Sequence, residues 1–209
     1  MFEKFMNLDT EKQERIINAS MEEFGKKGYN NASTNEIIKN AEISKGLLFH
    51  YFGSKKSLYF FLLDYSIKIF SEEFYGRLNY DETDIIIRWG QIALLKIDLI
   101  HKHPVLYQFL IASSTEDNLE IKKEIDERTK IVYEDAYKRL LINIDTSLYK
   151  DGMEASRISE IIIWVTQGFA NSELEKFKNN PDSKSTFDIA AIMPEFDEYM
   201  KLLKRAFYK

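Results

Sequence analysis

A stretch at residues 33–55 holds side chains that could bind a phosphate backbone and the edges of bases. Lys45 and Gly46 open an apolar run, where a cation and a small residue leave room for an anion beside free backbone N–H groups. His50 and Tyr51 follow about one turn later. Solvent-facing aromatic residues next to lysines favour contact with nucleic acid over a purely structural role.

Two short helical patterns must position these side chains. Ser33 stands three residues before Glu36, which predicts a capping box at the start of the first helix. Ser44 is the N-cap residue expected for the second helix. The linker is too short for antiparallel packing, so the helices should cross steeply and turn one face of the second helix outward. The pattern predicts a DNA-binding helix-turn-helix.

An alternative interpretation is a helical hairpin whose aromatic residues only form a core. Leu48 and Phe52 fit that interpretation, because they fall on the inward face of the second helix. Lys45 and Lys55, which flank the aromatic residues, favour the DNA-binding interpretation for the outward face.

The segment S-K-G-L-L-F-H-Y-F-G-S-K-K-S-L-Y, residues 44–59, resembles the signature of the tetracycline-repressor (TetR) family of bacterial transcription regulators. The preceding G-Y-N-N-A-S-T-N-E-I-I, residues 28–38, resembles that family's approach to its first motif helix. The resemblance covers residues 16–59. It implies an all-α fold: a three-helix unit with the helix-turn-helix, residues 1–53, and a larger helical ligand-binding and dimerisation domain, residues 54–209.

The resemblance also implies which residues contact DNA. They lie at the start of the first motif helix, along the recognition helix, and at the start of the helix that follows. The set is Thr34, Asn35, Ser44, Lys45, Gly46, Leu47, Phe49, His50, Tyr51 and Lys55.

Three positions depart from the family pattern. Leu47 stands where relatives often carry a hydroxyl or amide, so base readout there would be an apolar contact, such as one to a thymine methyl. Phe49 replaces the usual tyrosine, which removes one hydrogen bond to phosphate. Glu42 replaces the customary turn glycine, and a non-glycine residue in a left-handed turn carries a cost.

The charge distribution is nearly neutral where DNA binding is expected. The 209-residue chain has a net charge of −5. Residues 1–60 contain nine Lys or Arg and eight Asp or Glu, which leaves 20 basic and 26 acidic residues for the remainder. The lysines of the DNA-binding unit must therefore act by their placement, and the non-specific attraction to DNA should be modest.

Composition favours an all-helical, soluble protein. Three prolines and eight glycines are too few turn residues for a β-sandwich or barrel. No apolar run approaches the roughly 20 residues that span a bilayer, and no export signal is evident. The chain has no cysteine, which fits a reducing compartment, and we expect a cytoplasmic protein.

Apolar spacing predicts a series of helices joined by short polar breaks. Outside the motif, the expected helices are at residues 10–27, 54–77, 84–103, 105–113, 118–143, 154–178 and from about Pro194 onward, with a break at residues 179–182.

Catalytic and metal-binding motifs are not evident. His101 and His103 are two residues apart on an expected helix and point to different faces, so they make a poor metal pair. The chain has no nucleophile elbow, phosphate loop or dinucleotide fingerprint. We expect no enzyme, no metal and no cofactor.

Two further sets of residues are candidates for the C-terminal domain. Aromatic residues could line an apolar ligand pocket, although each taken singly fits a core as well: Trp89, Tyr107, Phe109, Tyr133, Tyr137 and Trp164. Apolar faces on the last two helices predict a twofold four-helix interface: Ile158, Ile161, Ile162, Val165, Phe169, Tyr199, Leu203 and Phe207. Burial of both faces within one subunit is the alternative.

The function expected from the sequence is a ligand-responsive transcription regulator, most simply a repressor. It would bind a palindromic double-stranded DNA operator as a homodimer and be released by a small hydrophobic or aromatic effector. The rival interpretation is a ligand-binding or protein-interaction module whose helix-turn-helix is only structural. The nearly neutral charge of residues 1–60 supports this second interpretation.

Overall fold

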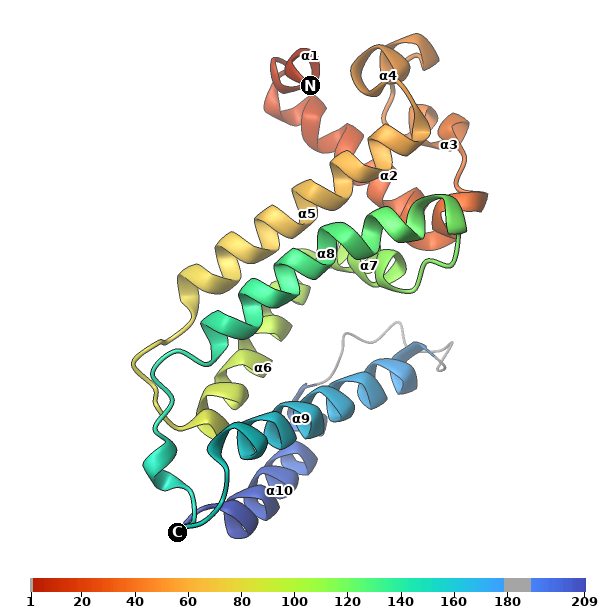
Figure 1. The fold of residues 1–209 in the computed structure, drawn as a ribbon. Helices are drawn as coiled ribbons and strands as arrows, with labels where there is room; N and C mark the ends of the chain where they lie inside the picture. Colours follow the sequence, from red (N-terminus) through yellow and green to blue (C-terminus); the bar gives the residue numbers. More distant parts are fainter. Residues whose placement is uncertain (1, 179–188) are drawn as a thin grey trace. The chain divides into compact units, whose positions relative to one another are not determined.

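The computed structural model describes residues 2–178 and 189–209, and over these ranges the chain is helical with no β-sheet. This confirms the all-α prediction. Figure 1 shows the helices along the chain. They are α1 (Glu3–Met6), α2 (Thr10–Asn31), α3 (Thr34–Asn40), α4 (Lys45–Phe52), α5 (Lys55–Arg77), α6 (Ile85–Lys102), α7 (Pro104–Ser114), α8 (Leu119–Leu140), the 3-10 helix η1 (Thr146–Leu148), α9 (Ala155–Lys178) and α10 (Ile189–Phe207).

Three boundaries differ from the expected ones. The short helix α1 was not predicted. Helix α2 does not end at Gly28: that residue has φ +67°, and one further turn continues to Asn31. Helix α10 begins at Ile189, so Pro194 lies inside it, where the ring removes one intrahelical hydrogen bond. The break expected at residues 179–182 lies outside the described residues.

The contacts within the chain define two compact units. The first unit is Met1–Gly76 with Lys102–Ala136, and the second is Arg77–His101 with Tyr137–Lys209. This division groups α7 and most of α8 with the helix-turn-helix. The boundary expected after residue 53, between a DNA-binding domain and a ligand-binding and dimerisation domain, divides the chain by function and stays a prediction.

Aromatic side chains form the centre of the first unit. Phe24 of α2, Tyr59 of α5 and Phe109 of α7 are each at most 2% exposed. The ring centroid of Tyr59 lies 5.1 Å from that of Phe24 and 5.3 Å from that of Phe109. The Tyr59 hydroxyl donates to Ser113 Oγ at 2.9 Å, and burial raises the pKa of Tyr59 to about 12. Three helices are therefore joined around one buried tyrosine.

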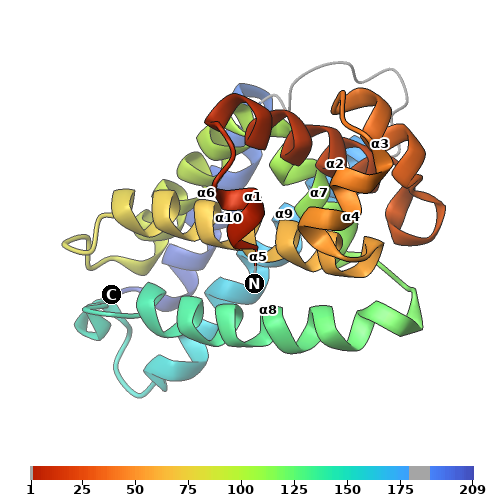
Figure 2. The ribbon, with the colours of Figure 1, turned by 90° about the horizontal axis from the view of Figure 1, so that it is seen from above.

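Helices α2 and α7 approach each other closely at Gly25, and Figure 2 shows the two side by side. A Cβ on Gly25 would lie 3.3 Å from the backbone nitrogen of Phe109. The absence of a side chain at Gly25 thus allows the two backbones to approach closely.

Helix α8 lies along α5 in the same unit. Ile121 and Ile125 of α8 are buried in the core of the unit. Arg128 forms ion pairs with Asp64 and Glu124, and its guanidinium lies 4.7 Å from the centroid of the Phe60 ring. Burial of the two isoleucines dominates the packing, because exposed ion pairs contribute little.

In the second unit, Arg88 of α6 joins two loops. It is fully buried, and its guanidinium donates to the backbone carbonyl groups of Tyr80, Glu82, Leu140 and Ile142. The carbonyl groups at the end of α8 carry the negative end of the helix dipole. The charge is thus stabilised without a carboxylate bonded to it among the described residues.

Helices α9 and α10 pack on each other in the second unit. The Phe169 ring lies 5.4 Å from that of Phe196 and 5.7 Å from that of Tyr199, measured between centroids. None of the helices in the described part of the chain is both long and apolar enough to cross a lipid bilayer.

Asp84 connects the start of α6 to the C-terminal end of α10. Its Oδ1 accepts the backbone N–H of Ile86 and the hydroxyl of Tyr208, each at 2.8 Å. Its Oδ2 accepts Lys204 Nζ at 2.9 Å. Burial alone would raise the pKa of Asp84, but the hydrogen bonds from Lys204 and Tyr208, with those from the backbone, outweigh it and lower the pKa.

We predict that this carboxylate makes the second unit sensitive to acid. Because the folded-state pKa of Asp84 is depressed, its contribution to stability is present above the unfolded pKa of about 4 and is lost as pH falls through the folded pKa. Asp84→Asn keeps a helix cap but removes the charge. Its free energy of unfolding should fall by about 1–3 kcal/mol at pH 7, and less at pH 3, in urea titrations.

Asp151→Asn is the matched control, because the Asp151 side chain is 94% exposed and pairs only with Lys209 across the surface. Its unfolding curve should match that of the wild type at both pH values. Parallel losses for Asp84→Asn at pH 7 and pH 3 would contradict the assignment.

Candidate nucleic-acid interface

The exposed start of α4 is capped as the sequence predicts. Ser44 has extended backbone angles, and its hydroxyl oxygen accepts the N–H of Leu47 at 3.3 Å. Ser44, Lys45 and Gly46 are all exposed. The Lys45 ammonium has no hydrogen bond or ion pair to any other described residue. A free cation therefore stands beside the positive end of a helix.

The capping box expected at Ser33 and Glu36 is wrong. Ser33 precedes α3, but its side chain makes no capping hydrogen bond. Its backbone N–H instead donates to Oε1 of Glu23 at 2.8 Å, from the middle of α2. Burial acts to raise the pKa of Glu23, but this bond and the bond from Lys27 lower it overall. A buried carboxylate on another helix thus replaces the local cap.

The turn between α3 and α4 has the left-handed residue that the sequence predicts. Glu42 has φ +53°. Ile43 donates its N–H to the carbonyl of Ile38 at 3.0 Å, and Arg15 Nε donates to the carbonyl of Ala41 at 2.9 Å. The bond from α2 holds the turn although no glycine is present.

The inward face of the motif is also as expected. Ile37 is fully buried, Leu48 is 2% exposed and Phe52 is 3% exposed. These side chains belong to the core of the first unit. The core interpretation is confirmed for them, so the outward face of α4 is the one left to bind.

The residues proposed to contact DNA all keep accessible surface. The exposed ones are Asn35, Ser44, Lys45, Gly46 and His50, and the half-buried ones are Thr34, Leu47, Phe49, Tyr51 and Lys55. Their contacts with DNA stay a prediction.

Lys55 differs from Lys45 because its ammonium is already engaged. Its Nζ donates to the carbonyl of Asn30 at 3.2 Å and lies 4.9 Å from the centroid of the Tyr29 ring. Burial lowers the pKa of Lys55, and the negative charges of Glu23 and Glu116 act in the opposite direction. The side chain therefore binds the C-terminal end of α2, and one of its three N–H donors is already used there.

A junction that the sequence does not reveal holds the last turn of α2. Oε2 of Glu116 accepts the N–H of Tyr29 at 2.8 Å, directly after the left-handed Gly28. Oε1 of the same carboxylate accepts the N–H of Asn118 at 3.0 Å. The partners are 87 residues apart, so no local pattern could have identified this contact.

The aromatic residues predicted to line a ligand pocket are divided between the two units. Tyr107 and Phe109 belong to the first unit, where Phe109 is core, and Trp89, Tyr137 and Trp164 belong to the second. The side chain of Tyr133 lies outside the described residues. Neither unit by itself gathers these aromatic residues.

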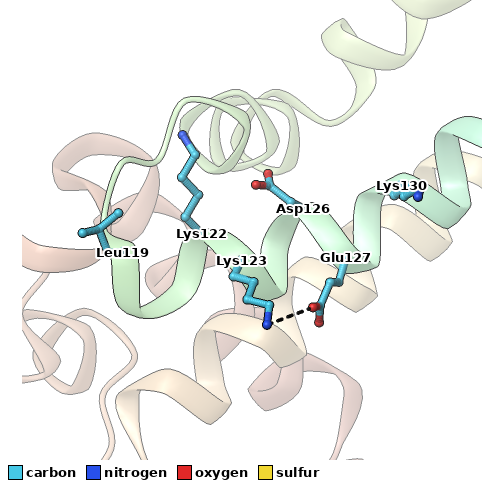
Figure 3. A pocket seen from close by; sticks show the side chains of 6 residues that line it. All are labelled: Leu119, Lys122, Lys123, Asp126, Glu127 and Lys130. Carbon is cyan, nitrogen blue, oxygen red and sulfur yellow. Dashed lines mark ion pairs between the residues drawn. The ribbon is translucent and has the colours of Figure 1, made fainter.

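A surface hollow of about 350 Å³ lies along α8 in the first unit. Figure 3 shows that a single helix supplies all of its side chains and that Lys123 and Glu127 form an ion pair there. The distance from Lys123 Nζ to Glu127 Oε1 is 3.8 Å. The lining is Leu119, Lys122, Lys123, Asp126, Glu127 and Lys130. Because one helix supplies the whole lining, the hollow is open to solvent and does not resemble an enclosed ligand site.

The residues predicted at a dimer interface fall into two groups. Ile158, Ile162 and Leu203 are each at most 9% exposed, so they are buried within the second unit and offer little surface to another subunit. The others keep accessible surface: Ile161, Val165, Phe169, Tyr199 and Phe207. Two exposed residues of the same helices were not among those predicted at the interface: Leu202, which is 59% exposed, and Trp164, which is 65% exposed and was predicted to line a pocket.

One of the two histidines expected to be poor metal ligands is bonded to a carboxylate in the first unit. Nε2 of His103 lies 2.9 Å from Oε1 of Glu73, which also pairs with Lys102. No group of three or more His, Asp or Glu side chains that could hold a metal ion occurs within residues 2–178 and 189–209.

Residues 16–60 match the model of the family described as bacterial regulatory proteins, tetR family. The chain is 28% identical over 166 residues to the uncharacterized HTH-type transcriptional regulator YuxN of Bacillus subtilis, a match covering 79% of this chain and 54% of YuxN. It is 44% identical over 55 residues to the HTH-type transcriptional regulator UidR of Escherichia coli, covering 25% and 28% of the two chains. The chain thus spans about half or less of the length of these curated relatives.

Solved structures share the fold over nearly the whole chain. A TetR family transcriptional regulator from Chloroflexus aurantiacus has a TM-score of 0.68 at 20% identity, covering 99% of this chain and 98% of that one. The regulator FadR from Bacillus subtilis has a TM-score of 0.58 at 17% identity, covering 90% and 96%. KstR2 of Mycobacterium tuberculosis has 0.59 at 14%, covering 97% of both.

These relatives are named as transcriptional regulators. The matched segment coincides with the capped, outward-facing α4 and the helices that hold it. Residues 16–60 therefore carry the helix-turn-helix segment of the tetR family of bacterial regulatory proteins, and the chain as a whole has the fold of TetR family regulators of known structure.

Proposed function

We propose that the protein is a ligand-responsive repressor that acts in the cytoplasm, binding a palindromic operator as a homodimer and leaving it when a small hydrophobic effector binds. The observation that carries the proposal is the start of α4. Ser44 satisfies one backbone N–H there, while Lys45 and Gly46 stay exposed beside the remaining ones. This arrangement suits a DNA phosphate at the mouth of the major groove.

The chemistry of α4 favours readout with a large apolar component. Leu47 and Phe49 are half-buried, and His50 is exposed. Apolar side chains in the major groove discriminate by contact with the thymine methyl group. We therefore expect thymine-containing half-sites, with His50 available for a polar contact.

A homodimer is supported by the apolar surface of α9 and α10. Trp164 is 65% exposed, Leu202 59% and Tyr199 42%. Two copies of this surface would bury those side chains in a four-helix arrangement, and a twofold axis would present two recognition helices to a palindrome. A single copy would read only one half-site.

An apolar effector is supported by proteins of similar fold. FadR of Bacillus subtilis was solved in complex with stearoyl-CoA, and KstR2 is described as a ketosteroid transcriptional regulator. Release would need a coupling free energy on the order of 1–3 kcal/mol between effector and operator. Helix α5, which is continuous from Lys55 to Arg77, begins directly after the recognition helix and can transmit a displacement to it.

The test is selection of bound fragments from a random DNA pool by the purified protein at moderate salt, followed by sequencing. The proposal expects a palindrome whose half-sites lie about one DNA turn apart. A folded, dimeric protein that enriches no sequence, before and after refolding to remove bound ligand, would instead support the module whose helix-turn-helix is only structural.

We predict that Lys45 contributes to DNA affinity through its charge and does not contribute to the sequence preference. Lys45→Ala should weaken binding to operator and to unrelated DNA by similar factors, because a phosphate contact is sequence-independent. The slope of log K against log salt should become shallower by about 1. Fluorescence anisotropy at four salt concentrations measures both quantities.

Lys68→Ala is the matched control, since the Lys68 side chain is 70% exposed on α5 and pairs only with Glu72. It should leave the salt slope unchanged. An unaltered slope for Lys45→Ala would remove Lys45 from the phosphate contacts. Lys55→Ala is assayed in parallel. A shallower salt slope for this variant would show that the Lys55 ammonium, which donates to the Asn30 carbonyl in the free protein, contacts DNA in the complex.

We predict that Trp164→Glu separates the dimer. The indole is exposed in the single chain but would be buried in the proposed dimer, so the substitution would place a charge inside the interface. The dimer dissociation constant should rise by at least about thirtyfold. Sedimentation velocity at micromolar protein would then give the monomer mass.

Leu119→Glu provides the control, because Leu119 is 89% exposed on α8 and receives the same kind of substitution. It should sediment as the wild type does. If Trp164→Glu also keeps the wild-type mass, the interface uses another surface.

A further inference from the structure

We infer that α1 is part of the DNA-reading unit and positions the recognition helix α4 through Phe5. This helix lies outside the segment that matches the family model, which begins at residue 16. The inference builds on the proposed DNA binding and adds a specificity-determining element to it.

The contacts between α1 and α4 are aromatic and buried. Phe5 is fully buried, and its ring centroid lies 4.8 Å from that of Phe52 and 6.1 Å from that of Tyr51. Phe2 adds a second contact, with its centroid 5.8 Å from that of Phe52. Such ring pairs add about 0.5–1.5 kcal/mol each beyond burial of their area.

The same two rings also bind α5, so α4 is held between two helices. The centroid of the Phe61 ring lies 5.2 Å from that of Phe5, 4.9 Å from that of Phe2 and 5.2 Å from that of Phe52. Four rings from three helices therefore meet at the C-terminal half of α4. Loss of the α1 rings would remove the support on that side of α4 and leave Phe52 with the Phe61 ring of α5 as its remaining aromatic contact outside α4.

The connection from α1 to α2 is rigid. Gln13 Nε2 donates to the carbonyl of Met6 at 3.0 Å and to that of Leu8 at 2.8 Å. Asp9 caps α2 by accepting the N–H of Lys12 at 2.8 Å. Because both ends of the turn are bonded, α1 acts as a fixed support and not as a mobile arm.

The supported part of α4 includes side chains expected to face DNA. Tyr51 is half-buried against Phe5, and its ring centroid lies 5.7 Å from that of the exposed His50. Base contacts need geometry held within about 0.5 Å. A change in the tilt of α4 would therefore weaken base readout more than it weakens the phosphate contacts of flexible lysine side chains.

Phe5→Ala tests the inference in the full-length protein, with Phe5→Leu as the conservative variant. The readout is the ratio of dissociation constants for non-specific and selected DNA. Phe5→Ala should reduce this ratio about tenfold or more, since lost base contacts cost specificity. Non-specific affinity should stay within about twofold and the salt slope should not change, because no cation is removed. Phe5→Leu should be intermediate.

Met6→Ala is the matched control on the same helix, because the Met6 side chain is 59% exposed. It should keep the wild-type ratio. If Phe5→Ala does not fold, Phe2→Ala removes a half-buried ring that also contacts Phe52 and Phe61 and tests the same support of α4.

Hydrogen exchange on the DNA-free protein gives a second readout. Phe5→Ala should raise exchange of the amides of residues 48–52 while those of α3 keep wild-type protection. Unchanged protection of these amides would overturn the inference, as would equal losses of specific and non-specific binding. Failure of the wild type to select any DNA would refute the proposed function alone, since the exchange experiment does not depend on DNA.

Discussion

The hydrogen bond from the Tyr29 N–H to Glu116 holds the last turn of α2, directly before the helix-turn-helix. The left-handed Gly28 interrupts α2 and leaves the next N–H without its intrahelical acceptor, and an unmet buried donor is costly. Glu116 accepts it from the turn that joins α7 to α8. The last turn of α2 then carries Asn30, whose carbonyl accepts Lys55 at the start of α5. The position of the motif thus depends on one carboxylate outside it.

The sequence pattern correctly predicted those features that depend only on residues close together in the chain. Ser44 caps α4 because its hydroxyl needs only the N–H three residues ahead, and α5 begins within one residue of its predicted start. The Ser33 capping box was wrong because a buried carboxylate, Glu23, competes for the same N–H from another helix. Periodicity cannot show such a competitor, since the two groups meet only after α2 and α3 have packed.

The same reasoning explains the partial prediction of the site. Inward residues such as Leu48 and Phe52 follow from helical spacing, because the motif has one core side. The faces of α9 could not be separated in this way, because apolar residues lie on more than one of them: Ile162 is buried and Trp164 is exposed. The role of α1 had a signal, Phe2 and Phe5 one turn apart, but a four-residue helix is too short for spacing to identify it.

The dependence of the motif on Glu116 and Asn118 also has a consequence for synthesis. The ribosome releases the chain from its N-terminus at about 5–20 residues per second. Residues 16–60 therefore appear several seconds before the α7–α8 turn that completes their packing, and during that interval the face of α2 that later meets Phe109 lacks this contact. The core around residues 16–60 stays incomplete until the sequence beyond Ile121 has emerged from the ribosome. The time at which this part of the chain can finish folding is therefore set by the rate at which α7 and α8 are synthesised.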